Sequence, residues 1–165
     1  MVLRHCLIIS SLFILLTGCG YSFNDGSASV LDERHRVLAI EGVDNPTTIT
    51  WLEPRLRKLL RDELTRRGTV AWTDEQKDAD ALIRIDIQRY YRPTVVEGEG
   101  EQTLRSSAIF KFEAVVTSTL DGSEVWRSGT ITQDWPFFSG QEDEADEEVT
   151  RLGIRRLADR MALNF

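Results

Sequence analysis

The chain has 165 residues, enough for one domain with a hydrophobic core, and 28% of them are charged. Its 27 Asp and Glu outnumber its 20 Lys and Arg, and this acidic balance argues against nonspecific nucleic-acid binding, which needs a basic surface. Beyond residue 18 the chain keeps one histidine, His35, and one cysteine, Cys19. We therefore expect no zinc site, no disulfide and no Ser-His-Asp arrangement.

The first eighteen residues have the pattern of an export signal. Arg4 supplies a positive charge, and residues 7–16 are almost all apolar, about half the roughly 20 residues that cross a bilayer. The Leu-Thr-Gly-Cys sequence that ends at Cys19 resembles the bacterial lipobox. The resemblance implies that residues 1–18 are a signal peptide and that Cys19 carries covalent diacylglycerol and an N-acyl chain as a membrane anchor. Gly20, where inner-membrane retention uses Asp, implies the outer membrane.

Residues 19–36 are polar and show no sustained periodicity, so we expect a tether between the lipid and the domain. A mostly apolar run at 36–43 predicts a first strand. Leucines at helical spacing predict an amphipathic helix that ends near Arg67, with Thr48 or Thr50 as its N-cap. Gly68 then stops the helix.

The next segments favour strands. Residues 69–73 predict a short strand, and residues 81–91 alternate between apolar and polar types. Residues 103–120 resume the alternation, and Asp121-Gly122 predicts a tight turn into a partner strand at 124–135. Between the two alternating strands, residues 95–102 predict a flexible acidic loop.

The acidic run at 141–148 predicts a solvated loop that leads into a final helix at about 146–163. Taken together, the elements predict an α+β fold, with two amphipathic helices packed on one face of a mixed, mostly antiparallel sheet of four to five strands. We expect this single domain to span residues 37–165.

Several segments resemble the lipopolysaccharide-assembly lipoproteins, the LptE-like or rare lipoprotein B family. These are Cys-Gly-Tyr at 19–21, Val-Leu-Ala-Ile at 37–40, the leucine-rich helix at 56–64 and Asp-Ala-Asp-Ala-Leu-Ile at 78–83. The order of strand, helix, long hairpin and C-terminal helix is also similar to that family.

The resemblance implies a non-enzymatic protein that plugs an outer-membrane β-barrel, the LptD-like lipopolysaccharide-assembly protein, and receives lipopolysaccharide. Phosphates on lipid A call for Arg or Lys. Five cations lie at outward strand positions or near loop ends, namely Arg84, Arg92, Arg105, Lys111 and Arg127. We expect Arg92, Arg105 and Lys111 to contact lipopolysaccharide because they flank the acidic loop.

A periplasmic interaction or regulatory lipoprotein, of the cell-wall synthase activator or secretin pilot type, is the alternative. Such proteins also combine a lipobox, a tether and a small α/β domain. A short tether, as here, favours work close to the membrane. A lipid-anchored enzyme is the third alternative, and no assembled catalytic site in the sequence supports it.

Overall fold

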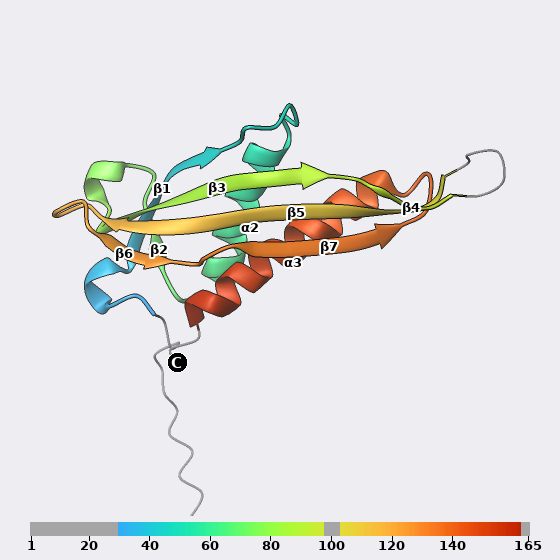
Figure 1. The fold of residues 1–165 in the computed structure, drawn as a ribbon. Coiled ribbons are helices and arrows are strands. Elements are labelled where there is room, and N and C mark those ends of the chain that lie inside the picture. Colours follow the sequence, from blue (N-terminus) through green and yellow to red (C-terminus); the bar gives the residue numbers. More distant parts are fainter. Residues whose placement is uncertain (1–29, 98–102, 163–165) are drawn as a thin grey trace, which may run out of the picture.

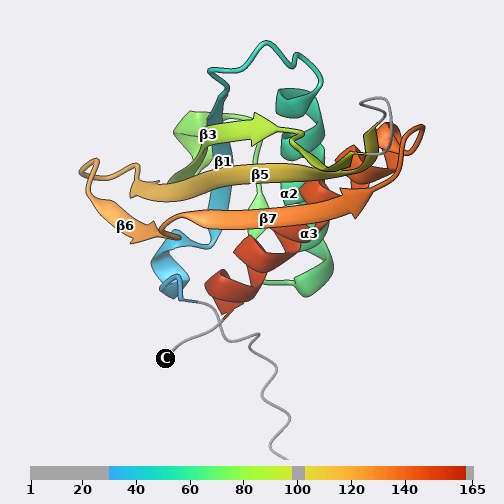
Figure 2. The ribbon, with the colours of Figure 1, turned by 45° about the vertical axis from the view of Figure 1, so that its right-hand side comes forward.

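The structure, a computed structural model, describes residues 30–97 and 103–162. The expected signal peptide and Cys19 lie outside these residues. Both helices cover one face of a single sheet, so the predicted α+β class is confirmed (Figures 1 and 2). The elements run in the order η2 (Glu33–His35), β1 (Val37–Asp44), α2 (Leu52–Arg67), β2 (Ala71–Trp72), η3 (Gln76–Asp78), β3 (Ala81–Tyr91), β4 (Thr94–Glu97), β5 (Thr103–Ser118), β6 (Glu124–Arg127), β7 (Ile131–Phe137) and α3 (Glu142–Ala162).

The long strand β5 organises the sheet. Its first edge pairs with β3 and then β4, and its other edge pairs with β7 and β6, all antiparallel. Strand β1 lies on the far side of β3 and pairs in parallel with both β3 and β2. Strands β3 and β4 lie one after the other along the first edge of β5, and β7 and β6 lie one after the other along its second edge. The described strands therefore fill five positions across the sheet.

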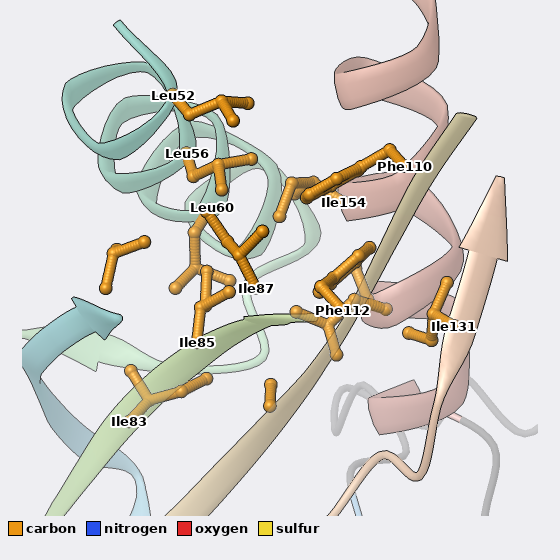
Figure 3. Close-up of a cluster of buried hydrophobic side chains, with 14 of the residues drawn as sticks. Leu52, Leu56, Leu60, Ile83, Ile85, Ile87, Phe110, Phe112, Ile131 and Ile154 are labelled. Atoms are coloured by element: carbon orange, nitrogen blue, oxygen red, sulfur yellow. The ribbon is translucent and has the colours of Figure 1, made fainter. Parts of the chain in front are cut away.

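Alternating apolar residues turn one face of the sheet into the core. Ile83, Ile85 and Ile87 of β3 point toward the helices, as the sequence predicts, and all are buried. The leucine stripe of α2 packs over them, as Figure 3 shows for Leu52, Leu56 and Leu60. Strand β5 contributes five inward residues, all buried as expected: Ala108, Phe110, Phe112, Ala114 and Val116.

Helix α3 approaches the sheet closely at Gly153. A Cβ atom there would lie 3.1 Å from ring atoms of both Phe110 and Phe112. These two rings stack, with centroids 4.4 Å apart, and neither is exposed to solvent. Glycine at this position therefore sets the depth at which α3 packs on β5.

The prediction that Thr48 or Thr50 caps the first helix is wrong. The helix begins at Leu52, its N-cap is Trp51, and no side chain caps it. The preceding loop is instead held by Asn45, whose side-chain nitrogen donates to the Ile49 carbonyl at 2.8 Å. The predicted stop at Gly68 is confirmed, since this residue has φ of 64°.

The predicted strand at 124–135 is interrupted. Ser128 to Thr130 leave the ladder between β6 and β7, and Gly129 has φ of 62°, a left-handed conformation that breaks a strand. Residues 94–97, most of them predicted as loop, form β4 against β5. The tight turn is confirmed at Gly122, with φ of 70°.

The final helix begins at Glu142, four residues before the predicted start, so most of the acidic run is helical. Carboxylates suit the positive end of a helix, which explains the earlier start. At the other end of the domain, Leu31 of the expected tether is buried, and the Val30 N–H donates to the Met161 carbonyl at 2.9 Å. The chain is therefore attached to the domain from residue 30 onward.

Candidate functional site

The sheet face opposite the helices divides into two halves with different charge pairing. Strand β1 stops at Asp44, which pairs with Asp86 of β3, and β3 and β5 continue beyond it. We call the part alongside β1 the proximal half and the part beyond it the distal half. Outward side chains in both halves come mainly from β3 and β5, because alternate residues face opposite sides.

Cations in the proximal half are paired with carboxylates. Arg84 bonds Asp86 at 2.8 Å, and Arg127 of β6 contacts Glu113 at 3.0 Å and Glu124 at 2.6 Å. The hydrogen bonds from Arg127 also hold the pKa of the Glu124 carboxyl below its usual value. These cations of the proximal half therefore already have carboxylate partners.

Cations in the distal half are not paired in this way. A register shift after Ile87 brings Arg89 directly opposite Lys111, and both point away from the helices. Neither makes an ion pair with any residue that the structure describes. Asp134, an acid on the neighbouring strand β7, lies opposite Ile109 in the strand register and not opposite Lys111. Directly opposed like charges destabilise a sheet, so this pair is a position that an anion would stabilise.

Tyr91 extends this cationic position. Its ring lies 4.7 Å from the Arg89 guanidinium carbon, and its side chain is 38% exposed. The stacked ring holds Arg89 in place on the surface. We define the distal strip as Arg89, Tyr91, Lys111 and Arg105.

Arg105 lies on the same face but further along β5. It is exposed and pairs in register with Val96 of β4. It lies six positions from Lys111 along the strand, which is roughly 20 Å at the usual rise of a strand. Among the described residues Arg105 also has no ion pair. Arg105 and Lys111, both predicted to contact lipopolysaccharide, thus lie on the same face of β5 but too far apart to bind one phosphate together.

Arg92, the third predicted contact residue, points to the helix side. Its Nε donates to Oδ1 of Asp146 at 3.0 Å, and its Nη2 donates to Oδ2 of the same carboxylate. The Tyr90 hydroxyl also donates to Asp146, which is only 6% exposed. Burial, followed by the neighbouring Asp146 carboxylate, raises the pKa of the Tyr90 phenol above its usual value.

This cluster of Tyr90, Arg92 and Asp146 joins the end of β3 to the second turn of α3. Sequence analysis missed Asp146 because it stands in an acidic run, where solvation is the usual state of a carboxylate. The helical spacing of Asp146 with Val149 and Thr150, both buried, was the signal that would have placed it inward.

No group of three or more His, Cys, Asp or Glu residues that suits a metal ion occurs within the described ranges 30–97 and 103–162. Within the same ranges, no helix is both long and apolar enough to span a bilayer. Cys19, the predicted lipidation site, is outside them.

The fold is that of a small two-layer α+β protein. On its outward sheet face, the arginines Arg84 and Arg127 of the proximal half have carboxylate partners, whereas Arg89 and Lys111 of the distal half have none among the described residues. The lipopolysaccharide-assembly family (LptE) matches residues 36–164, and the chain therefore belongs to that family and has a role in lipopolysaccharide assembly. Among curated protein sequences, none matches the chain.

Solved structures with a similar fold include two bacterial proteins. PelC from Paraburkholderia phytofirmans, solved as a dodecamer, has a TM-score of 0.58 at 12% identity, covering 81% of this chain and 93% of that one. Lipoprotein B from Nitrosomonas europaea has a TM-score of 0.56 at 9% identity, covering 84% and 87%. At these identities the likeness concerns the fold alone.

Proposed function

We propose that this protein is a lipid-anchored lipoprotein of the outer membrane that partners and plugs an LptD-like β-barrel and contacts lipopolysaccharide through the distal strip. Family membership supports the assembly role. The observation that carries the contact site is the opposed pair Arg89 and Lys111, which has no carboxylate partner among the described residues. Lipid A phosphates would supply the missing negative charge.

In this proposal the protein acts by binding, without catalysis. Arg105 and Lys111 keep their predicted contact role, and Arg89 joins them because the sheet register brings it to Lys111. Arg92 serves mainly to hold the end of β3 on α3, since its guanidinium is bonded to Asp146.

A matched pair of variants tests the contact site. In the full-length protein, changing both Arg89 and Lys111 to Gln should weaken binding to lipopolysaccharide-containing vesicles by about 10- to 100-fold, the loss expected for one or two charge-assisted contacts. Changing Arg84 to Gln, which removes a paired cation on the same face, should alter binding by no more than about twofold. Equal losses in both variants would contradict the assignment of the distal strip.

The anchor and the partner need a separate experiment. Mass analysis of the mature N-terminus should find Cys19 bearing diacylglycerol and an N-acyl chain, with residues 1–18 removed. Gentle detergent extraction should recover the protein with a large outer-membrane barrel, and depletion should reduce lipopolysaccharide at the cell surface. An unmodified sulfur, or recovery of the protein without a barrel, would refute this part of the proposal and favour the regulatory alternative.

A further inference from the structure

Helix α3 is divided into two halves of opposite charge. Residues 142–148 carry six carboxylates and no lysine or arginine, whereas residues 151–160 carry four arginines and one carboxylate, Asp159. The helix dipole favours this order of signs, but its influence falls off within the first and last turns. Among the four arginines only Arg160 lies in the last turn. The helix dipole therefore does not account for the other three.

Three of these arginines have no carboxylate partner among the described residues. Arg155 is exposed and makes no ion pair there. Arg156 donates to the Thr132 carbonyl at 3.2 Å, and Arg160 donates to the Thr130 carbonyl at 3.3 Å. Because a carbonyl is neutral, these bonds hold the guanidinium groups in place without cancelling their charge. We call Arg155, Arg156 and Arg160 the basic end of α3.

The neighbouring charged groups cancel one another. Arg151 pairs with Glu148 at 2.5 Å, and the two arginines that end α2 are matched by Glu63 and Asp159. Residues 32–36, which include η2, contain two carboxylates and two arginines. The basic end is therefore a local excess of positive charge in a chain whose net charge is −7.

The chain enters the domain beside the basic end. The Val30 N–H donates to the Met161 carbonyl at 2.9 Å, one residue beyond Arg160. Cys19, the proposed lipid anchor, stands eleven positions before Val30, a length that spans no more than about 40 Å even when fully extended. An anchor at Cys19 therefore keeps the basic end within this distance of the membrane.

The opposite end of α3 is acidic and lies farther from the point of attachment. Figure 2 shows α3 running from the end of β7 back toward η2. Asp146, which bonds Arg92 at the end of β3, is roughly 21 Å from Arg160 along the helix axis. Asp143 and Glu144, both exposed, precede it. An anionic surface attracts the basic end and repels the acidic one, so it favours one orientation of the domain.

We propose that the basic end of α3 docks on anionic phospholipid headgroups of the membrane that holds the lipid anchor, and so directs the distal strip away from that membrane. Phosphate oxygens accept charge-assisted hydrogen bonds from guanidinium groups. Each cation contributes only about fivefold to the ratio of docked to undocked protein, but the anchor makes the contact intramolecular, so a weak attraction is sufficient. This inference rests on the proposed anchor at Cys19 and is independent of lipopolysaccharide binding.

Energy transfer to acceptor-labelled headgroups tests the orientation. The full-length lipidated protein, purified from membranes, is reconstituted into phosphatidylcholine vesicles with or without phosphatidylglycerol. A fluorophore is attached at Ala162→Cys, beside the basic end, or at Asp143→Cys, at the acidic end. With phosphatidylglycerol, transfer from position 162 should exceed transfer from position 143 by at least about threefold, since the two positions differ by roughly 28 Å along the helix. This ratio should fall in phosphatidylcholine alone and in about 1 M salt, which screens the attraction.

The possible failures are distinguishable. If the protein stays on the vesicles but the ratio does not depend on phosphatidylglycerol, or if position 143 is the closer one, docking is wrong while the anchor stands. Loss of the protein from both kinds of vesicle would refute the anchor and, with it, the docking.

A matched pair of variants tests the role of charge. Changing Arg155 and Arg156 to Gln should lower the ratio of docked to undocked protein by about 25-fold, or about fivefold for each cation. Changing the same two residues to Lys keeps both charges and should alter this ratio by no more than about twofold. Equal losses in the two variants would mean that guanidinium contacts within the domain, and not attraction to the membrane, set the orientation, which would overturn the proposal.

An acidic surface of a partner protein is the alternative binding partner for these cations. Because the vesicles contain no other protein, an orientation seen there comes from the lipid. Orientation that is absent in anionic vesicles and present in native membranes that contain the barrel would refute docking on lipid and assign the basic end to a protein. None of these measurements involves lipopolysaccharide, so the contact role of the distal strip is tested separately.

Discussion

Asp146 is the residue whose role depends most on its surroundings. Its carboxylate accepts from the Tyr90 hydroxyl and from two nitrogens of Arg92, although it stands among seven other residues of an acidic run. A buried carboxylate is stable only when it is hydrogen-bonded and paired, and these three donors meet that need. Asp146 thus stabilises the position of the β3 end, which carries Arg89 and Tyr91 of the distal strip.

Changing Asp146 to Asn should lower the free energy of unfolding by about 2 kcal/mol, because the Arg92 guanidinium loses its counter-charge and one donor loses its acceptor. Urea denaturation of the protein measures the change. Changing Asp143 to Asn, an exposed carboxylate of the same first turns, is the control and should cost no more than about 0.5 kcal/mol. Similar losses in the two variants would mean that the cluster contributes nothing specific.

Helices α2 and α3 are held together by charge as well as by apolar packing. Arg67 of α2 bonds Glu63 of its own helix at 2.8 Å and Asp159 of α3 at 2.7 Å. Glu63 is only 12% exposed. Burial alone raises the pKa of its carboxyl, but the hydrogen bonds from Arg67 and Arg66 outweigh burial and hold that pKa below its usual 4.5.

A lowered pKa in the folded state makes this contribution pH-dependent. The stabilisation is fully present above the unfolded-state pKa near 4.5, and it is lost as the pH falls through the lower folded-state value. Changing Glu63 to Gln should therefore cost about 1 kcal/mol at pH 7 and progressively less below pH 4.5. Urea denaturation of both proteins across this range checks the sign, and a cost that grows toward acid pH would contradict it.

Individual elements show where local sequence is sufficient. The span of β3 and the stop of α2 at Gly68 agree with the sequence, because alternation and a left-handed glycine act within a few residues. The break at Ser128–Thr130 was not visible in the apolar pattern. It depends on Gly129 and on Arg160, which reaches this backbone from α3.

The packing of α3 beside the sheet determines which backbone carbonyls at the β7 edge are occupied. In β7, Arg156 of α3 donates to the Thr132 carbonyl at 3.2 Å, and Pro136 has no N–H. Both features hinder pairing of this edge with other copies, a common hazard of exposed strands. Changing Arg156 to Ala together with Pro136 to Thr should unblock the β7 edge and promote self-association, seen as larger species in analytical ultracentrifugation as the concentration rises. The control is Arg155→Ala, an exposed neighbour on α3. If the double variant behaves like this control, the edge contacts do not protect the sheet.

The charge difference between the two halves of the sheet face also belongs to this scale. Sequence analysis singled out Lys111 and Arg105 by their closeness to the acidic loop, and both lie on the outward face. It did not single out Arg89, because only the register shift after Ile87 brings this residue opposite Lys111. Arg84 and Arg127 differ from these residues because they form ion pairs, which the sequence does not reveal.

The sequence by itself determined the fold class, the faces of the helices and long strands, and the resemblance to a family that the comparison then confirmed. These depend on periodicity and on residue type, which are local. Only the tertiary structure decided which cations are paired, which carboxylate is buried and which carbonyls at the sheet edge are occupied. Each of these depends on neighbours distant in the chain, such as Asp146 beside Tyr90 and Arg156 beside Thr132. Pairing of that kind follows from strand register and helix placement, which no local pattern encodes.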